Sequence, residues 1–197
     1  MTRLELVALG ASWGGIDALR EILGGLPPDL PFALLVVQHR GKDTSDGLLE
    51  LFQRSASAPV LEPEDKEPIL PGRIYLAPAD YHLLVERRSF ALSTDEVVNH
   101  ARPSIDVVFE SAAQAFRERL LAIILSGSGS DGALGLKCVK SLGGLTAAQD
   151  PHTAQVRAMP DAAIVRAGPH RIVPLERIAE FILTACFAGV DAAASGG

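Results

Sequence analysis

The sequence predicts an α/β fold: a doubly wound, mostly parallel sheet with helices on both faces and one small β-hairpin. Apolar runs of strand length alternate with helical patterns along the chain, and this order is typical of a parallel sheet with crossover helices. The first runs carry no polar alternation, which is expected of strands covered on both faces. Apolar residues make up 48% of the 197 residues, enough for a sizeable core.

The first half of the predicted sheet begins close to the N-terminus. Residues 4–9 and 32–37 form two buried strands, and residues 16–26 between them carry apolar side chains at helical spacing. The glycine and proline pairs at 24–25 and 27–28 end that helix. Residues 48–52 follow a polar loop and predict a second helix.

The middle of the chain changes character between residues 60 and 85. Prolines recur there and the apolar runs are short, so small strands and turns are expected, one of them at residues 74–77. The runs at 83–85 and 90–92 flank an arginine pair and predict the hairpin.

The second half returns to strand and helix alternation. Ser104 or Asp106 is expected to cap a helix that extends through Leu120. The remaining elements are a buried strand, a helix, two short strands and a last helix, at residues 121–125, 133–142, 145–148, 172–173 and 175–187. The sequence contains no internal repeat and no linker. We therefore predict one domain over residues 1–190 and a disordered tail over residues 191–197.

Composition excludes several classes of function. The formal net charge is −6 and no run of lysines or arginines exists, so neither nucleic acid binding nor adhesion to an anionic membrane is expected. No apolar stretch approaches the ~20 residues of a membrane span, and the N-terminus is a poor signal peptide. Cys138 and Cys186 fall in apolar helical patterns. We therefore expect both to be buried free thiols in a reducing compartment. A cytoplasmic protein follows, of unspecified oligomeric state.

Three predicted strands end in side chains that can perform chemistry. Ser12 lies in a glycine-rich turn after the first strand, His39 follows the second, and Asp131 lies in the glycine-rich loop after residues 121–125. The carboxyl ends of parallel strands meet at one edge, where ligands bind in such sheets. A serine nucleophile, a histidine base and an orienting carboxylate are the components of acyl transfer to water, with backbone N–H groups available for an oxyanion.

Each of these residues also has a simpler explanation. Ser12 suits a phosphate-binding or capping role, His39 a polar contact at a strand end, and Asp131 a helix N-cap. The turn at Ser12 lacks the G-x-G-x-x-G pattern of a dinucleotide site, and no Lys-Ser/Thr follows its glycines as a P-loop requires. Spacing alone leaves these alternatives open.

Seven segments, taken in order, resemble the catalytic domain of CheB-type protein-glutamate methylesterases of bacterial chemotaxis over residues 6–180. They are GASWGG at 10–15, VQH at 37–39, PGRIYLAP at 71–78, RPSID at 102–106, SGSGSDGA at 126–133, AQD at 148–150 and MP at 159–160. Each segment alone is weak, but seven in order are specific. The family's doubly wound parallel sheet agrees with the fold that the apolar pattern predicts.

The resemblance implies roles for individual residues. Ser12 is similar to the family's nucleophile, His39 to its base and Asp131 to the carboxylate that orients the base. The implied reaction is hydrolysis of glutamate methyl esters on chemoreceptor helices with release of methanol, and also deamidation of receptor glutamine in many members. No metal or organic cofactor is implied. Further candidates for the oxyanion site or cleft are Trp13, His82, Ser128, Gly129 and Met159.

Three positions depart from the family pattern. Ser128 stands where a methionine is usual, Trp13 replaces a small residue after the nucleophile, and Ala158 replaces the glycine before the Met-Pro pair. These changes bear on efficiency and substrate range more than on the type of reaction.

The resemblance covers the catalytic domain alone. Family members usually carry an N-terminal receiver domain, which this sequence does not include, so we expect either a stand-alone enzyme or a domain excised from a longer protein. The starting methionine and the lack of a linker favour the stand-alone enzyme. A non-catalytic module that binds a receptor and a small-molecule carboxylesterase are the alternative functions.

Overall fold

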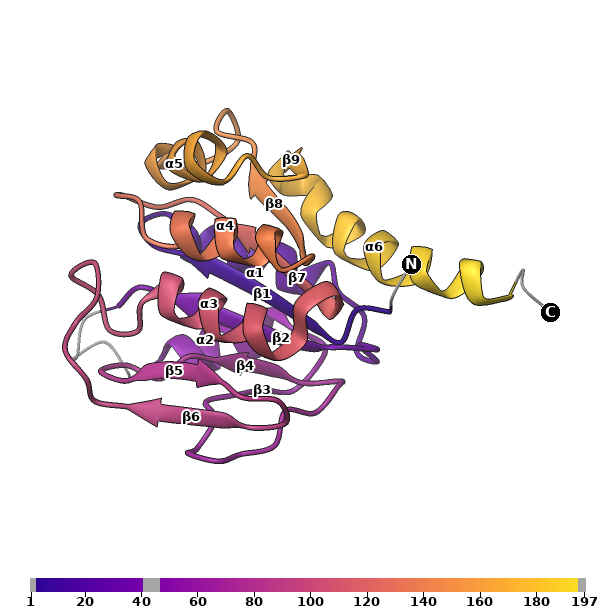
Figure 1. Cartoon of the computed structure of the whole chain (residues 1–197), viewed down its shortest axis with the longest axis horizontal. Helices are drawn as coiled ribbons and strands as arrows, with labels where there is room; N and C mark the ends of the chain where they lie inside the picture. The colour runs from indigo at the N-terminus through magenta and orange to yellow at the C-terminus, as the bar shows by residue number, and fades with distance from the viewer. Residues whose placement is uncertain (1–2, 41–46, 195–197) are drawn as a thin grey trace.

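The computed structural model describes residues 3–40 and 47–194, with side chains through residue 186, and contains a parallel sheet of seven strands (Figure 1). The strand order is β3-β4-β2-β1-β7-β8-β9, and every neighbouring pair is parallel. The strands are β1 (Leu6–Ala11), β2 (Ala33–Gln38), β3 (Val60–Leu61), β4 (Ile74–Leu76), β7 (Leu120–Ile124), β8 (Leu145–Gln149) and β9 (Arg171–Val173).

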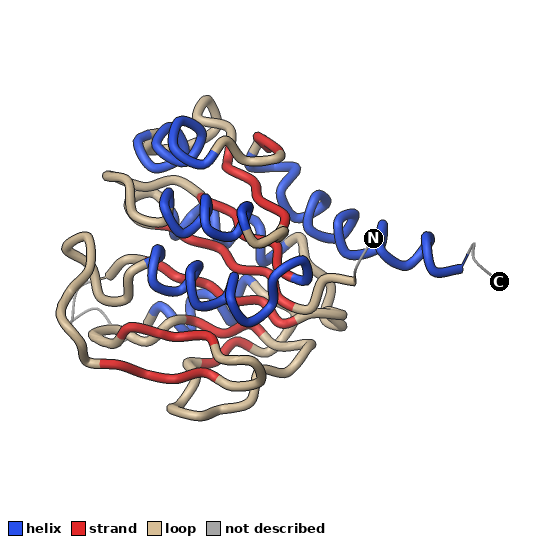
Figure 2. Tube along the Cα trace, in the orientation of Figure 1, coloured by secondary structure: helices blue, strands red, loops and turns tan. Residues whose placement is uncertain are grey.

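The predicted hairpin is a separate two-stranded sheet. Strands β5 (His82–Val85) and β6 (Phe90–Ser93) pair antiparallel, with Val85 opposite Phe90. Together with the helices on both sides of the large sheet, visible in Figure 2, this arrangement confirms the predicted fold class.

Six α-helices and two 3₁₀ turns connect the strands in the described part of the chain. They are α1 (Gly15–Gly24), α2 (Leu48–Ser55), α3 (Ile105–Phe116), η1 (Arg117–Arg119), α4 (Ala133–Ser141), α5 (Ala158–Ala167), η2 (Leu175–Arg177) and α6 (Ile178–Ala194). Helices α1, α2 and α6 pack on one face of the sheet, whereas α3, α4, α5 and the hairpin pack on the other.

Strand β1 supplies side chains to both apolar layers because its residues alternate between the faces. Leu6 and Ala8 join the layer under α3, whereas Val7 and Leu9 join the layer under α1. All of these side chains are fully buried, which explains why the strand is apolar throughout. With three strands on either side, β1 is the central strand of the sheet.

The helix predicted from residue 104 through Leu120 is shorter than expected. It ends at Phe116 because Arg117 adopts a φ of 51°, a left-handed conformation that stops an α-helix. Residues 117–119 form the 3₁₀ turn, and Leu120 is the first residue of β7. Ser104 occupies the N-cap position but its side chain makes no capping hydrogen bond, and Asp106 lies inside the helix.

Two further differences concern the last third of the chain. Helix α5 was not predicted: the residues that it buries are mostly small, and Pro160 in its first turn resembles a helix break although it is tolerated there. The last helix starts at Ile178 and continues through Ala194, into the segment expected as a disordered tail. Residues 195–197 of that segment lie outside the described residues.

The two cysteines are free thiols, Cys186 buried and Cys138 half-buried. Burial raises the pKa of the Cys186 thiol to about 12, so this side chain behaves as an apolar core residue. Among the described residues, no helix combines the length and apolar character that crossing a bilayer requires.

Candidate active site

Strand pairing brings Ser12 and His39 to the same edge of the sheet. The register pairs Ala11, the last residue of β1, with Gln38, the last residue of β2. Ser12 and His39 directly follow these two residues. The backbone N–H of His39 donates to the carbonyl of Ala11 at 2.9 Å. Asp131 arrives from the loop after β7, which pairs with β1 on its other side.

His39 and Asp131 are in direct contact. The Nε2 atom of His39 lies 2.7 Å from Oδ2 of Asp131, and the two side chains are 18% and 4% exposed. An ionised carboxylate only accepts hydrogen bonds, so Nε2 carries the hydrogen and Nδ1 of the neutral ring is left as the basic atom.

Ser12 and His39 line the same pocket, of about 460 Å³, together with Trp13, Gln38 and Gln155 among others. Within the described part of the chain, the Ser12 hydroxyl makes no hydrogen bond to the His39 ring. In unliganded sites the hydrogen bond between a hydroxyl and its base is often long or poorly aligned, and it tightens when substrate binds.

The carboxylate of Asp131 is held by the N-terminus of α3. It accepts the backbone N–H groups of Ile105 at 2.7 Å and Asp106 at 3.2 Å, and the hydroxyl of Ser104 at 3.0 Å. Asp131 therefore satisfies the start of α3, whereas Gly132 is the N-cap residue of its own helix, α4.

The donors around Asp131 outweigh its burial. Burial opposes ionisation, but hydrogen bonds from His39, from Asn99 and from the N–H of Ile105 lower the pKa of Asp131 to about 2. Asp131 is therefore an anion at neutral pH and is suited to stabilise a positive charge on His39.

Asn99 joins Asp131 to a second buried carboxylate. Its Nδ2 group lies 2.8 Å from Oδ1 of Asp131 and 2.8 Å from Oδ2 of Asp106. Asp106 also accepts the N–H of Gly135 at 2.7 Å. Burial and the nearby charge of Asp131 raise the pKa of Asp106. Asn99 is not among the site residues predicted from the sequence. Its φ is 53°, a conformation that asparagine tolerates better than most residues.

The turn after β1 holds Ser12 from several sides. Its N–H donates to the carbonyl of Ser126 at 3.0 Å, and its carbonyl accepts Nε2 of Gln38 at 2.9 Å. In the described residues the N–H groups of Trp13 and Gly14 donate to no acceptor. They follow Ser12 at the start of α1, where free N–H groups can donate hydrogen bonds to an anion.

The five other predicted cleft residues occupy different places. Trp13 lines the pocket and is 71% exposed. Met159 is buried, and its sulfur lies 2.0 Å from where a Cβ on Gly127 would stand. Ser128 and Gly129 are exposed and, among the described residues, do not line the pocket around Ser12.

His82 lies outside the pocket and supports α3 instead. It is 3% exposed, its Nε2 lies 2.9 Å from the carbonyl of Glu96, and its Nδ1 lies 3.4 Å from the N–H of Ser104. The ring therefore joins the loop before α3 to the residue that donates to Asp131. Among the described residues, no group of three His, Cys, Asp or Glu side chains is arranged to hold a metal ion.

Comparison with known proteins gives one consistent family. The model of the CheB methylesterase family matches residues 7–182. The crystal structure of the Thermotoga maritima CheB methylesterase catalytic domain superposes with a TM-score of 0.89 at 31% identity, covering 92% of this chain and 98% of that one.

The curated relatives differ in length. A relative from Leptospira interrogans is 40% identical over 180 residues, which are 91% of this chain and 93% of its own length. One from Carboxydothermus hydrogenoformans is 39% identical over 184 residues, and one from Pseudomonas aeruginosa is 39% identical over 183. This chain spans 54% and 52% of the latter two, which are named protein-glutamate methylesterase/protein-glutamine glutaminase; the first carries that name provisionally.

Proposed function

Because the chain belongs to the CheB methylesterase family, we propose that it hydrolyses glutamate methyl esters on chemoreceptors and releases methanol. The observation that carries the proposal is the contact of 2.7 Å between His39 and Asp131 beside a pocket that Ser12 lines. Together they supply a nucleophile, a base and an orienting anion at one edge of the sheet.

In the acylation step, Oγ of Ser12 attacks the ester carbonyl while Nδ1 of His39 takes the hydroxyl proton. The negative charge that develops on the carbonyl oxygen is received by the N–H groups of Trp13 and Gly14. Asp131 stabilises the imidazolium. When the tetrahedral intermediate collapses, the bond between carbonyl carbon and methoxy oxygen breaks, and the imidazolium gives its proton to the leaving group, forming methanol.

Deacylation repeats these steps with water. His39 takes a proton from a water molecule, the resulting hydroxide attacks the acyl carbon, and the bond to Oγ of Ser12 breaks as Oγ regains a proton. The products are glutamate on the receptor and the free enzyme. The same sequence applied to glutamine releases ammonia instead of methanol, which accounts for the second activity in the relatives' names.

We propose that the reaction takes place in the cytoplasm and that methylated chemoreceptor helices are the partner. We propose that residues 1–190 act as one catalytic unit, because the strands of one sheet contribute side chains to both apolar layers. No metal or organic cofactor takes part in the proposed steps, in which the chain's own side chains make every proton transfer.

A comparison of substrates tests the proposal. The purified chain is incubated with a methylated chemoreceptor fragment and, in parallel, with a small carboxylic methyl ester, and methanol is measured in both. We expect rapid release from the receptor and slow release from the small ester. Equal or faster turnover of the small ester would favour a carboxylesterase, and no release from either would favour a non-catalytic module.

A further inference from the structure

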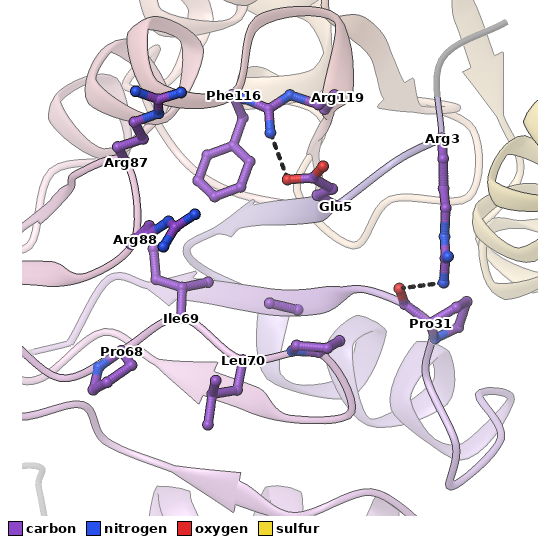
Figure 3. Close-up of a pocket in the computed structure, with 12 residues that line it drawn as sticks. Arg3, Glu5, Pro31, Pro68, Ile69, Leu70, Arg87, Arg88, Phe116 and Arg119 are labelled. Carbon is purple, nitrogen blue, oxygen red and sulfur yellow. Dashed lines mark hydrogen bonds and ion pairs between the residues drawn. The ribbon is translucent and has the colours of Figure 1, made fainter.

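A second cavity lies at the opposite edge of the sheet from Ser12. It encloses about 610 Å³ and is lined by residues that precede β1, β2, β4 and β7 (Figure 3). Glu5, for example, comes directly before β1, and Pro31 lies two residues before the start of β2. Parallel strands separate this amino edge from the catalytic edge, so a ligand here leaves the pocket of Ser12 open. We name it the amino-edge pocket.

Part of the lining of the amino-edge pocket is apolar, and we call this part the floor. Ile69 and Leu70 lie on one side and Phe116 on the other, with prolines beside them. The side chain of Leu70 is 40% exposed although it is large and apolar. An apolar surface of this kind favours contact with an apolar group of a ligand.

Four arginines surround that floor. Arg119 is already engaged, since it lies 2.5 Å from Glu5 and stacks over the ring of Phe116 at 5.4 Å. Arg87 and Arg88, on the turn between β5 and β6, are exposed and form no ion pair with any described residue. Figure 3 shows these two guanidinium groups beside the cavity. Two adjacent cations are therefore free to receive a negatively charged group.

Charge at this pocket is opposite to that of the whole molecule. The chain carries a net charge of −6, but the pocket is lined by four arginines and one glutamate, Glu5, which Arg119 neutralises. A basic pocket on an acidic protein attracts acidic partners to one place and repels them elsewhere.

The arrangement of the donors distinguishes between kinds of anion. A site for a compact anion such as phosphate needs buried donors that converge on one point, or a helix N-terminus. Here the free guanidinium groups are exposed on a turn, and apolar side chains such as Leu70 line the same pocket. Such a surface suits an extended ligand with apolar and acidic groups.

We propose that the amino-edge pocket docks an acidic peptide segment of a partner protein, with an apolar side chain on Leu70 and Phe116 and carboxylates at Arg87 and Arg88. The volume lies within the range of ligand-binding pockets and accommodates a few residues of such a segment. Docking there holds a partner on the enzyme while the catalytic edge remains accessible.

Fluorescence anisotropy tests this proposal. The probe is a fluorescein-labelled synthetic peptide that alternates leucine with pairs of glutamate, titrated with the full chain at low salt. We expect saturable binding that weakens with added salt and is weakened about tenfold or more by the double substitution Arg87→Gln/Arg88→Gln. Leu70→Ser is expected to weaken binding of the same peptide because it removes an apolar side chain from the floor.

The matched control is Arg54→Gln/Arg177→Gln, which removes the same charge from exposed arginines outside the pocket and is expected to change affinity less than twofold. Four results would overturn the proposal. They are no binding of the probe, equal binding by the Arg87 and Arg88 variant, competition by inorganic phosphate equal to that of the unlabelled peptide, and equal competition by a peptide with serine in place of leucine. Hydrolysis of a small ester is measured alongside, and the Arg87 and Arg88 variant is expected to retain it. Failure of peptide docking is thus distinguishable from failure of the esterase proposal.

Discussion

At the scale of single residues, Asp131 joins the carboxyl edge of the sheet to helix α3. It accepts five hydrogen bonds, from His39, Asn99, Ser104, Ile105 and Asp106. A buried anion with so many donors is stabilised by the positive end of a helix and by direct hydrogen bonds. The orientation of His39 therefore depends on how α3 begins, and not only on the loop that carries Asp131.

The lowered pKa of Asp131 predicts a pH-dependent contribution to stability. The pKa falls from 3.8 to about 2 on folding, so the ionised carboxylate stabilises the protein above about pH 4, and this stability is lost as the pH falls through the folded value. We expect the difference in free energy of unfolding between wild type and Asp131→Asn to be roughly 2 kcal/mol larger at about pH 6 than at about pH 2. Urea unfolding across that range measures the difference, and an unchanged difference would contradict the assignment of the donors.

Asn99 is predicted to act as a positioning residue. Asn99→Gly removes the amide that bridges Asp131 and Asp106 but tolerates the φ of 53°. Two hydrogen bonds to carboxylates are lost, so we expect kcat to fall about 10- to 100-fold while KM changes little.

The control for Asn99→Gly is Lys66→Gly, which makes the same kind of change at a φ of 64° on the far side of the hairpin. Its kcat is expected to equal that of the wild type. An equal loss in both variants, or a rise in KM alone, would mean that Asn99 does not position the carboxylate.

Sequence reasoning reached some of these residues and not others for a physical reason. Ser12, His39 and Asp131 follow buried strands, and apolar runs are readily recognised in a sequence. Asn99 lies in a loop without periodicity, and its role depends on a contact with Asp131, 32 residues away. The one sequence signal for Asn99 is the tendency of asparagine to adopt a positive φ, and this tendency does not indicate which residue its side chain contacts.

At the scale of elements, the turn between β1 and α1 is shaped by the packing of α5. A Cβ atom on Gly127 would lie 2.0 Å from the sulfur of Met159 in α5 and 2.9 Å from Cβ of Ser12. The backbone of Gly127 also donates to Val156 and accepts from Met159. Helix α5 was not predicted from the sequence, yet its Met159 limits the space beside Ser12.

Gly127→Ala is therefore predicted to disturb the active site. The extra methyl group must push Met159 or Ser12 away, at a cost of about 1–3 kcal/mol of stability, and activity is expected to fall about tenfold or more. Gly24→Ala is the control, because its new methyl group meets only an ordinary contact at 3.5 Å. Melting temperature and methanol release are measured for both, and full activity in Gly127→Ala would contradict the packing argument.

Element boundaries show where local sequence signals stop being sufficient. Strands β1, β2 and β7 were predicted to within two residues because burial on both faces makes them uniformly apolar. The end of α3 at Phe116 depends on the backbone of Arg117, a residue type with no marked preference for a positive φ. The apolar pattern of α3 continues into Leu120 because Leu120 belongs to the next buried strand, β7.

At the scale of the whole molecule, one sheet separates two kinds of surface. The carboxyl edge carries Ser12, His39 and Asp131, whereas the amino edge carries the basic pocket with Arg87 and Arg88. Strand β1 alone is six residues, or about 20 Å, long, so one protein chain bound across the molecule could contact both edges. The rigid parallel sheet thereby fixes the distance between proposed docking and proposed chemistry.

The most direct test of the central claim is methanol release from a methylated chemoreceptor fragment by Ser12→Ala. Removing one hydroxyl at a turn should leave the melting temperature close to that of the wild type, and Ser141→Ala, which removes an exposed hydroxyl from the end of α4, serves as the control. We expect Ser12→Ala to lose activity by about 10³-fold or more and Ser141→Ala to keep it. A folded Ser12→Ala protein that turns over substrate at the wild-type rate would contradict the claim that Ser12 is the nucleophile.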